Sequence, residues 1–262
     1  MRNTKIFLRD ERIFKAIIDA ANLTSDTIVL EIGSGDGRLT RRLAEKAKKV
    51  YAVEFDLNLL DASKMFLKDL TNVVFVHSDF LKLDIPDDSN RVVSNLPYAI
   101  SSPATEMVAR FLDKHADSMA IIMYQTEFAE RMLSFPGLRD YSMLSVFSQY
   151  ALYVEKVVDV RKSSFKPMPS VDSIVLKMTP KRTSIDDGFL SFCRLIFQHK
   201  KKSLYAAVID SRSKLSTKSK DSLREKLKTL DENLLKTKVF FFSVDELLNI
   251  YSNMVRLSIC QQ

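Results

Sequence analysis

The stretch Ile28-Val-Leu-Glu-Ile-Gly-Ser-Gly-Asp-Gly37 decides the fold of this 262-residue chain. Ile28–Ile32 is a short apolar run of the kind that forms a buried strand, and three glycines alternate with other residues directly after it. Glycine adopts positive φ freely and lets the backbone pass close to a ligand. Because a helical pattern follows at Leu39–Lys48, the stretch predicts the strand, turn and helix with which doubly wound sheets bind nucleotides.

Strand-like and helical patterns alternate outward from this unit. Short β-branched runs predict strands at Ile28–Ile32, Val50–Phe55, Val73–His77, Arg91–Ser94, Met119–Tyr124, Tyr153–Val160 and Ile174–Met178. Periodic stretches between the early strands predict helices at Leu39–Lys48, Leu57–Leu70 and Ser101–Leu112. The predicted class is α/β, with a Rossmann-like, mostly parallel sheet and helices on both faces. The last two strands have little helix between them, so we expect an antiparallel hairpin at one edge.

The polar, breaker-rich stretch Pro180–Gly188 ends this alternation. Beyond it we expect helices alone, at Phe189–His199, Ser203–Ile209, Ser219–Leu230 and Ser243–Tyr251. Ser243-Val-Asp-Glu246 has the pattern of a capping box and opens the last of them. The sequence therefore predicts two domains, a larger α/β domain over residues 1–179 and a small all-helical domain over residues 180–262.

The net charge of +7 lies entirely in the predicted helical domain. Residues 1–179 contain 24 basic and 24 acidic side chains, whereas residues 180–262 contain 16 basic and 9 acidic ones. A neutral large domain followed by a basic small one favours a polyanionic partner for the tail. A solvated, lysine-rich helical surface without a partner is the alternative interpretation.

Composition excludes several other classes of protein. The chain is 46% hydrophobic and 28% charged, as in ordinary globular proteins, and it has no apolar run long enough to span a bilayer. The start lacks the apolar region of a signal peptide, so we expect a cytoplasmic protein without membrane contact. Cys193 and Cys260 are far apart and outside any C-x-x-C motif, which predicts reduced thiols and no metal site.

The glycine loop predicts the kind of cofactor. The dinucleotide fingerprint G-x-G-x-x-G would need glycine where Arg38 stands. The pattern is instead E-x-G-x-G-x-G on Glu31, Gly33, Gly35 and Gly37, which is the shape of the S-adenosylmethionine loop in the common methyltransferase fold. A structural turn that binds no ligand is the alternative.

Two acidic residues at later strand ends support a nucleoside cofactor. Glu54 ends the second strand, where a carboxylate can accept hydrogen bonds from ribose hydroxyls. Asp79 ends the third, where methyltransferases often place an acid for the adenine amine, and Phe80 would pack on that ring. Glu54 alone could be an ordinary solvated loop residue, and NAD enzymes place an acid at the same position. Three strand ends with the right spacing favour a bound ligand over a site without one.

Asn95-Leu96-Pro97-Tyr98 follows the fourth strand and is typical of methyltransferases that act on amino groups of nucleobases. The N6 lone pair of adenine is delocalised into the ring, so the amine is a poor nucleophile. The Asn95 side-chain carbonyl and a main-chain carbonyl near Leu96–Pro97 could localise that lone pair as the new bond forms. Tyr98 would stack on a base swung out of an RNA fold, although a plain Pro-Tyr turn is the alternative.

Five segments together resemble the KsgA-like small-subunit ribosomal RNA adenine N6,N6-dimethyltransferases, over nearly the whole chain. They are Phe7-Leu8-Arg9-Asp10, Asn95–Ser101, Tyr141–Tyr150, Ser164–Ser173 and Phe197–Ser203. The resemblance implies dimethylation of two adjacent adenosines near the 3′ end of small-subunit (16S-type) rRNA during ribosome biogenesis. It implies small-subunit rRNA, within the pre-ribosomal small subunit, as the partner, and we expect a monomer.

The resemblance also assigns residues. It implies that Phe165 forms the second wall of the adenine slot, and Leu8 would give main-chain contacts to the cofactor. Lys5 and Ile6 stand where the family has Gln and Asn or His. The three consecutive cations Lys200, Lys201 and Lys202 must occupy several helix faces, so at least one is exposed and could contact RNA phosphate.

Three other functions stay open from the sequence. The erythromycin-resistance methyltransferases modify large-subunit rRNA and share the Asn95–Tyr98 loop pattern. A catalytically silent rRNA-binding assembly factor would explain the replacements at Lys5 and Ile6. A DNA adenine methyltransferase is a weaker alternative.

Overall fold

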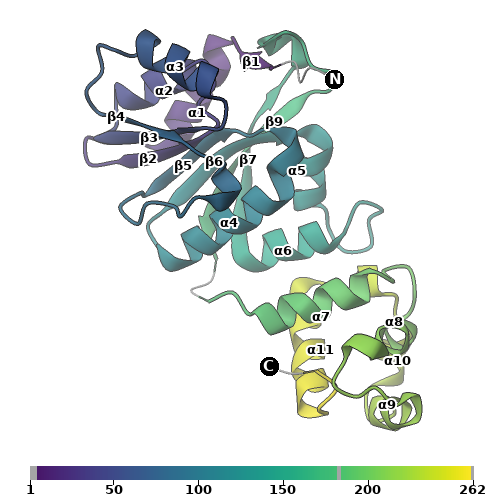
Figure 1. Ribbon diagram of the computed structural model, residues 1–262. Coiled ribbons are helices and arrows are strands. Elements are labelled where there is room, and N and C mark those ends of the chain that lie inside the picture. Colours follow the sequence, from purple (N-terminus) through teal and green to yellow (C-terminus); the bar gives the residue numbers. More distant parts are fainter. Residues whose placement is uncertain (1–4, 182–183, 261–262) are drawn as a thin grey trace. The chain divides into compact units, whose positions relative to one another are not determined.

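The computed structural model describes residues 5–181 and 184–260, apart from the side chain of Tyr98. The chain divides into two compact units (Figure 1). The first contains residues 1–129 and 151–183, and the second contains residues 130–150 and 184–262. The sequence-based division at 179/180 assigned residues 130–150 to the first domain, whereas their contacts place them with the C-terminal helices.

The first unit is built on a seven-stranded sheet. In spatial order its strands are β4 (Val73–His77), β3 (Lys49–Glu54), β2 (Ile28–Ile32), β5 (Arg91–Asn95), β6 (Met119–Gln125), β9 (Ser173–Pro180) and β7 (Leu152–Val160). The first five run parallel, while β9 is antiparallel to both β6 and β7. The predicted mostly parallel sheet with an antiparallel hairpin at one edge is confirmed. The antiparallel strand is β9, however, and the edge strand β7 runs in the same direction as the first five.

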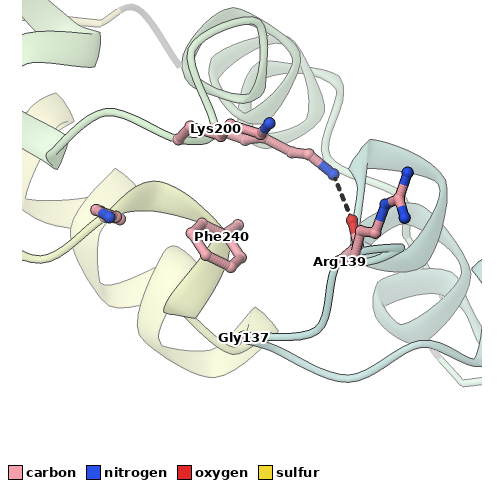
Figure 2. A pocket seen from close by; sticks show the side chains of 6 residues that line it. Gly137, Arg139, Lys200 and Phe240 are labelled. Carbon is pink, nitrogen blue, oxygen red and sulfur yellow. Dashed lines mark hydrogen bonds between the residues drawn. The ribbon is translucent and has the colours of Figure 1, made fainter.

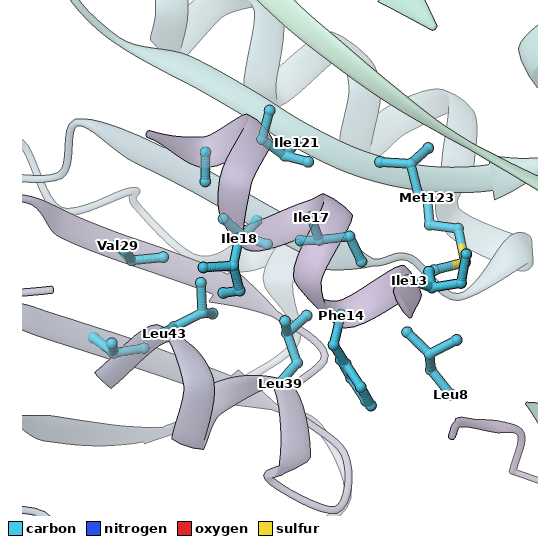
Figure 3. Packing of buried hydrophobic residues seen from close by; sticks show 14 of the residues in the cluster. Leu8, Ile13, Phe14, Ile17, Ile18, Val29, Leu39, Leu43, Ile121 and Met123 are labelled. Carbon is cyan, nitrogen blue, oxygen red and sulfur yellow. The ribbon is translucent and has the colours of Figure 1, made fainter. Parts of the chain in front are cut away.

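Helices cover both faces of this sheet. They are α1 (Glu11–Ala21), α2 (Arg38–Ala44), α3 (Leu57–Phe66) and α4 (Ser101–Lys114). The unit also contains the 3₁₀ turns η1 (Phe80–Lys82), η2 (Tyr98–Ile100) and η3 (Lys162–Ser164) and the first half of α5 (Thr126–Leu133), whose second half belongs to the second unit. Ile13 and Ile17 of α1 belong to one apolar cluster with Val29 of β2 and Met123 of β6, and Ile13 lies beside Met123 (Figure 3). On the opposite face, the Thr105 hydroxyl of α4 lies 2.8 Å from the Tyr124 hydroxyl of β6. Burial on both faces explains why the strands read as continuous apolar runs.

A second, two-stranded sheet ties the start of the chain to a distant segment. Strand β1 (Phe7–Leu8) pairs antiparallel with β8 (Phe165–Lys166). Two further hydrogen bonds extend the contact: the Arg9 amide donates to the Ser164 carbonyl at 2.8 Å, and the Ser164 hydroxyl donates to Asp10 at 3.0 Å. Asp10 also caps α1, so residues 7–10 are held by β8 at one end and by the helix at the other.

The second unit is helical in the residues that the structure describes. It comprises α6 (Met143–Ala151), α7 (Asp187–Phe197), α8 (Leu204–Asp210), α9 (Lys220–Leu227), α10 (Glu232–Lys236) and α11 (Val244–Arg256), with 3₁₀ turns η4 (Arg212–Lys214) and η5 (Val239–Phe241). The predicted capping box is present, since Ser243 and Glu246 bond reciprocally at the start of α11. The Tyr141 hydroxyl donates to the Phe242 carbonyl at 2.9 Å, which attaches the 130–150 segment to the tail.

The described residues contain neither a membrane-spanning helix nor a cluster of metal-ligand side chains. None of the helices within 5–181 and 184–260 is long and apolar enough to cross a membrane. Over the same ranges, no group of three or more His, Cys, Asp or Glu side chains is arranged to hold a metal ion. Cys193 is buried and reduced, and Cys260 is a half-buried free thiol.

Candidate functional site

The predicted site residues gather where four parallel strands end. Gly33 follows β2, Glu54 ends β3, Asp79 lies just after β4, and Asn95 ends β5. These strands are neighbours and run in the same direction, so their carboxyl ends share one edge of the sheet. Ligands of open α/β sheets bind at this edge.

The glycine loop has the positive φ angles that its sequence predicts. Gly33, Gly35 and Gly37 have φ of 72°, 55° and 78°. A Cβ atom at Gly33 would lie 3.5 Å from Cδ of Pro97, and one at Gly35 would lie 3.4 Å from Cε1 of Phe7. The loop therefore touches the Asn95–Tyr98 loop at one glycine and the N-terminal strand at the next.

The carboxylate of Glu54 supports the glycine loop. Its Oε2 accepts a hydrogen bond from the Gly35 amide at 3.0 Å, and its Oε1 accepts one from the Asp56 amide at 2.9 Å. Each carboxylate oxygen has a second lone pair. Glu54 can therefore hold the loop and still accept hydrogen bonds from the hydroxyls of a sugar.

Glu31 is a buried carboxylate directly before this loop. It is 1% exposed, and burial raises its pKa to about 8, helped by the negative charges of Glu54 and Asp36 and opposed by the Thr40 hydroxyl. Its Oε2 has no hydrogen-bond partner among the described residues, nor does the buried Ser34 hydroxyl. A buried polar group of this kind costs free energy unless it is satisfied, so the site fits a ligand that brings a cation or donors.

The structure places Asp79 and Phe80 at the start of η1. The Asp79 side chain accepts a hydrogen bond from the Leu81 amide at 3.1 Å, so it caps this turn. Phe80 is buried, at 4% exposure. Asp79 keeps lone pairs for a further donor, while contact between Phe80 and a ligand ring stays a prediction.

The loop after β5 is anchored by a hydrogen bond from the end of β5 to the neighbouring strand β2. The Ser94 hydroxyl donates to the Ile32 carbonyl at 2.7 Å, which fixes the end of β5 to the end of β2. Leu96 is buried and Pro97 is exposed. The Pro97 carbonyl accepts a hydrogen bond from the Ile100 amide at 3.1 Å, whereas no amide of the described residues donates to the Leu96 carbonyl. Of the carbonyls near which the single main-chain acceptor was expected, that of Leu96 is therefore the better candidate. The Tyr98 side chain lies outside the described part of the chain.

The N-terminal segment contributes Phe7 and Arg9, which the sequence did not reveal as site residues, beside Lys5, which it did single out. Phe7 lies against Gly35, and the Arg9 guanidinium is 3.1 Å from the Asp36 carboxylate within the glycine loop. Lys5 forms an ion pair with Asp56, which follows β3. Long-range contacts of this kind leave no local sequence signal. Lys5 replaces the glutamine of the family with a cation that is already paired.

Phe165 and Leu8 are brought together as register partners of β8 and β1. Both are buried, at 5% and 4% exposure, in the apolar cluster that packs on α1. The structure thus joins a residue predicted for the base slot to one predicted for the cofactor. The stacking role of Phe165 stays a prediction.

The three consecutive lysines have different surroundings. Lys200 donates through Nζ to the Arg139 carbonyl at 3.1 Å (Figure 2). It also donates to the Tyr141 carbonyl at 2.7 Å. Lys202 pairs with Asp210 at 2.7 Å. Lys201 is exposed. Among these three, Lys201 is the one whose ammonium group is most available to an external anion.

The sheet order and the ligand edge define a Rossmann-like methyltransferase fold. The family model described as "Ribosomal RNA adenine dimethylase" matches residues 2–238, and the chain belongs to this family.

Named relatives agree with this assignment. A "Probable ribosomal RNA small subunit methyltransferase A" of Methanopyrus kandleri is 41% identical over 234 residues, which cover 87% of this chain and 82% of the relative. The protein of the same name from Methanococcus maripaludis is 37% identical over 254 residues, with 95% of each chain covered.

Two solved structures share the fold over almost the full chain. A dimethyladenosine transferase from Plasmodium falciparum superposes with a TM-score of 0.83 at 28% identity and covers 97% of this chain and 99% of its own. The 23S rRNA methyltransferase ErmE superposes with a TM-score of 0.68 at 24% identity, over 95% of this chain and 99% of its own, and supports the fold alone.

Proposed function

We propose that this chain is an S-adenosylmethionine-dependent rRNA adenine N6,N6-dimethyltransferase. Its substrate would be two adjacent adenosines near the 3′ end of small-subunit rRNA, modified during ribosome biogenesis in the cytoplasm. The observation that carries the proposal is the close approach of Gly33 and Pro97, where a Cβ atom added to the glycine would lie 3.5 Å from the proline ring. This brings the loop expected to hold the methyl donor beside the loop expected to hold the amine. Family membership and the names of the relatives support the choice of RNA.

The cofactor pocket would be built from the strand ends. Gly33, Gly35 and Gly37 let the backbone approach the ligand, Glu54 would accept the ribose hydroxyls, and Asp79 with Phe80 would hold the adenine. The unsatisfied Glu31 carboxylate suits the positively charged methionine end, and Leu8 would add main-chain contacts. When bound, S-adenosylmethionine supplies an already activated methyl group.

The protein's own task is then to prepare the adenine amine. Asn95 Oδ1 and the Leu96 carbonyl would accept the two N6 hydrogens and localise the lone pair as the bond to carbon forms. Because these acceptors stabilise the developing cationic amine more than the neutral one, they lower the barrier. Tyr98 and Phe165 would hold the base between them, with Phe165 positioned by its pairing with Leu8. No strong general base is required, since the methylated amine is acidic.

A direct test is methyl transfer by the purified full chain to each ribosomal RNA separately, followed by mass spectrometry of the modified nucleosides. We expect dimethyladenosine in small-subunit rRNA, without transfer to naked DNA. Label that enters only large-subunit rRNA would support the erythromycin-resistance activity instead and overturn the proposal. Failure to modify any RNA under conditions of cofactor binding would point to a silent assembly factor.

Asn95→Ala tests the mechanism. Removing one preorganised acceptor should lower the rate by about 10²–10³-fold. Cofactor affinity should change by less than about tenfold, because the three other strand ends remain. Asn233→Ala, at an exposed position of α10, is the matched control and should keep the full rate. Full activity of Asn95→Ala would contradict the assigned role.

A further inference from the structure

The second unit contains a basic pocket of about 360 Å³. It is lined by Gly137, Arg139, Lys200, Lys201, Lys238 and Phe240 (Figure 2). Its volume lies within the range of about 300–1,000 Å³ that small ligands occupy. Four of the six lining residues are cationic and one is aromatic, a combination that distinguishes this pocket from a plain lysine-rich surface.

The walls of the pocket are fixed by backbone hydrogen bonds. The Gly137 amide donates to the Phe240 carbonyl at 2.8 Å, and the Phe240 amide donates to the Lys200 carbonyl at 3.1 Å. Gly137 has a φ of 85°, and a Cβ atom there would lie 3.1 Å from Cδ1 of Phe241. Glycine is thus needed for the loop to lie so close to η5. These bonds hold three segments, distant in sequence, around one space.

Lys200 positions this wall. Its ammonium donates to the carbonyls of Arg139 and Tyr141, which ties the 137–141 loop to the end of α7. Burial and the positive charges of Arg131 and Lys201 lower its pKa, while Asp140 opposes the shift. Two of its three N–H donors are therefore committed to the protein.

The remaining cations are free to meet a ligand. Arg139, Lys201 and Lys238 are all exposed, and within the described ranges none has a hydrogen-bonded or ion-paired side-chain partner. Lys202 points its charge elsewhere, to Asp210. Arginine forks onto phosphate oxygens, while lysine adds compact point charges. The half-buried ring of Phe240 supplies an apolar surface in the same pocket.

We propose that this pocket binds one unpaired nucleotide of the RNA substrate. Arg139, Lys201 and Lys238 contact its phosphate, and the base stacks on Phe240. Stacked aromatics beside a positively charged groove are the general means of holding single-stranded nucleic acid. The inference rests on the proposed function, which supplies RNA as the partner. It gives two of the consecutive lysines different roles: Lys201 contacts the nucleotide, whereas Lys200 positions the pocket wall.

The test uses the full chain and two labelled probes of ten units: an oligouridylate, and a strand of the same length with abasic riboses. Arg139→Ala/Lys201→Ala/Lys238→Ala should weaken both probes and reduce the slope of log affinity against log salt by about 0.7, the value for one phosphate contact on a single strand. Phe240→Ala should weaken the oligouridylate about 5- to 100-fold and leave the abasic strand unchanged, while Phe240→Tyr should bind both as the wild type does.

Lys214→Ala/Lys218→Ala/Lys220→Ala is the control for charge, since it removes three exposed cations of the same unit outside the pocket. An equal loss of probe affinity in both triple variants would overturn the assignment of the nucleotide to this pocket. It would show instead that the whole basic surface attracts RNA without a defined site. Equal weakening of both probes by Phe240→Ala, in a variant whose urea unfolding matches that of the wild type, would overturn the stacking. Absence of methyl transfer by the wild type would refute the proposed function, whereas these binding comparisons would still decide the pocket.

Discussion

Leu8 and Phe165 are register partners in a two-stranded antiparallel sheet, although they come from the two ends of the first compact unit. The hydrogen bond from the Arg9 amide to the Ser164 carbonyl continues this pairing. Phe7, next to Leu8, lies against Gly35. The N-terminal strand therefore links the glycine loop to the segment that carries Phe165. A change at Phe165 should act both on the apolar cluster and on the substrate slot.

Two substitutions at Phe165 separate these effects. Phe165→Leu keeps most of the buried volume, so it should cost less than about 1.5 kcal/mol of unfolding free energy. Methyl transfer should nevertheless fall about tenfold or more, because the stacking surface is lost. Phe165→Ala should cost about 3–5 kcal/mol through the cavity it leaves. Urea unfolding and methyl-transfer rates measure the two quantities.

Phe14→Leu is the matched control, since Phe14 is buried in the same cluster on α1. It should lose similar stability and keep the rate of methyl transfer. If Phe165→Leu retains the wild-type rate as well, Phe165 is only a core residue and the slot needs another wall.

Local patterns were sufficient to predict most of the first unit. The strands from Ile28 to Gln125 follow short apolar runs, and the site residues follow those strands, because parallel strands bring their carboxyl ends to one edge. The capping box at Ser243 was predictable for the same reason, since its partners are three residues apart. Signals of this kind depend on near neighbours in the sequence.

Contacts between distant segments could not be predicted in this way. The pairing of β1 with β8, the ion pair of Lys5 with Asp56 and the attachment of Tyr141 to Phe242 each join residues with no common motif. The three lysines at 200–202 are indistinguishable in sequence, but their ammonium groups have different partners. Two carbonyl groups lie beside Lys200 and Asp210 lies beside Lys202, and all of these come from other segments of the chain.

Gly37 should tolerate a side chain less well than Gly33. Alanine at either position suffers the strain of positive φ, about 1–2 kcal/mol. At Gly37 the added Cβ would also lie 2.6 Å from Oγ of Ser63, whereas at Gly33 the nearest atom is 3.5 Å away. Overpacking adds about 1–3 kcal/mol. Urea unfolding should therefore rank Gly37→Ala below Gly33→Ala in stability.

A double-mutant cycle isolates the clash. The Ser63 hydroxyl is buried and has no hydrogen-bond partner among the described residues, so Ser63→Ala should cost little by itself. In the Gly37→Ala background it should restore part of the lost stability, because the closest atom is gone. Strict additivity of the two substitutions would show that backbone strain alone explains the loss.

Glu31 should make stability depend on pH. Burial raises its pKa in the folded protein to about 8, above the ordinary 4.5. The folded state therefore holds this proton more tightly than the unfolded state. The stabilisation is full below pH 4.5 and is lost as the pH rises through about 8, at up to about 1.4 kcal/mol per pH unit between the two values.

Glu31→Gln, which cannot ionise, isolates this contribution from those of all other titrating groups. Unfolding free energies of both proteins, measured in urea from pH 5 to pH 9, should show wild type losing stability relative to the variant up to about pH 8 and then running parallel to it. S-adenosylmethionine should flatten the wild-type decline, because its positive charge favours the ionised carboxylate. A difference that stays constant over the whole range would mean that Glu31 is already ionised throughout in the folded protein, and that its buried oxygen is satisfied without a ligand.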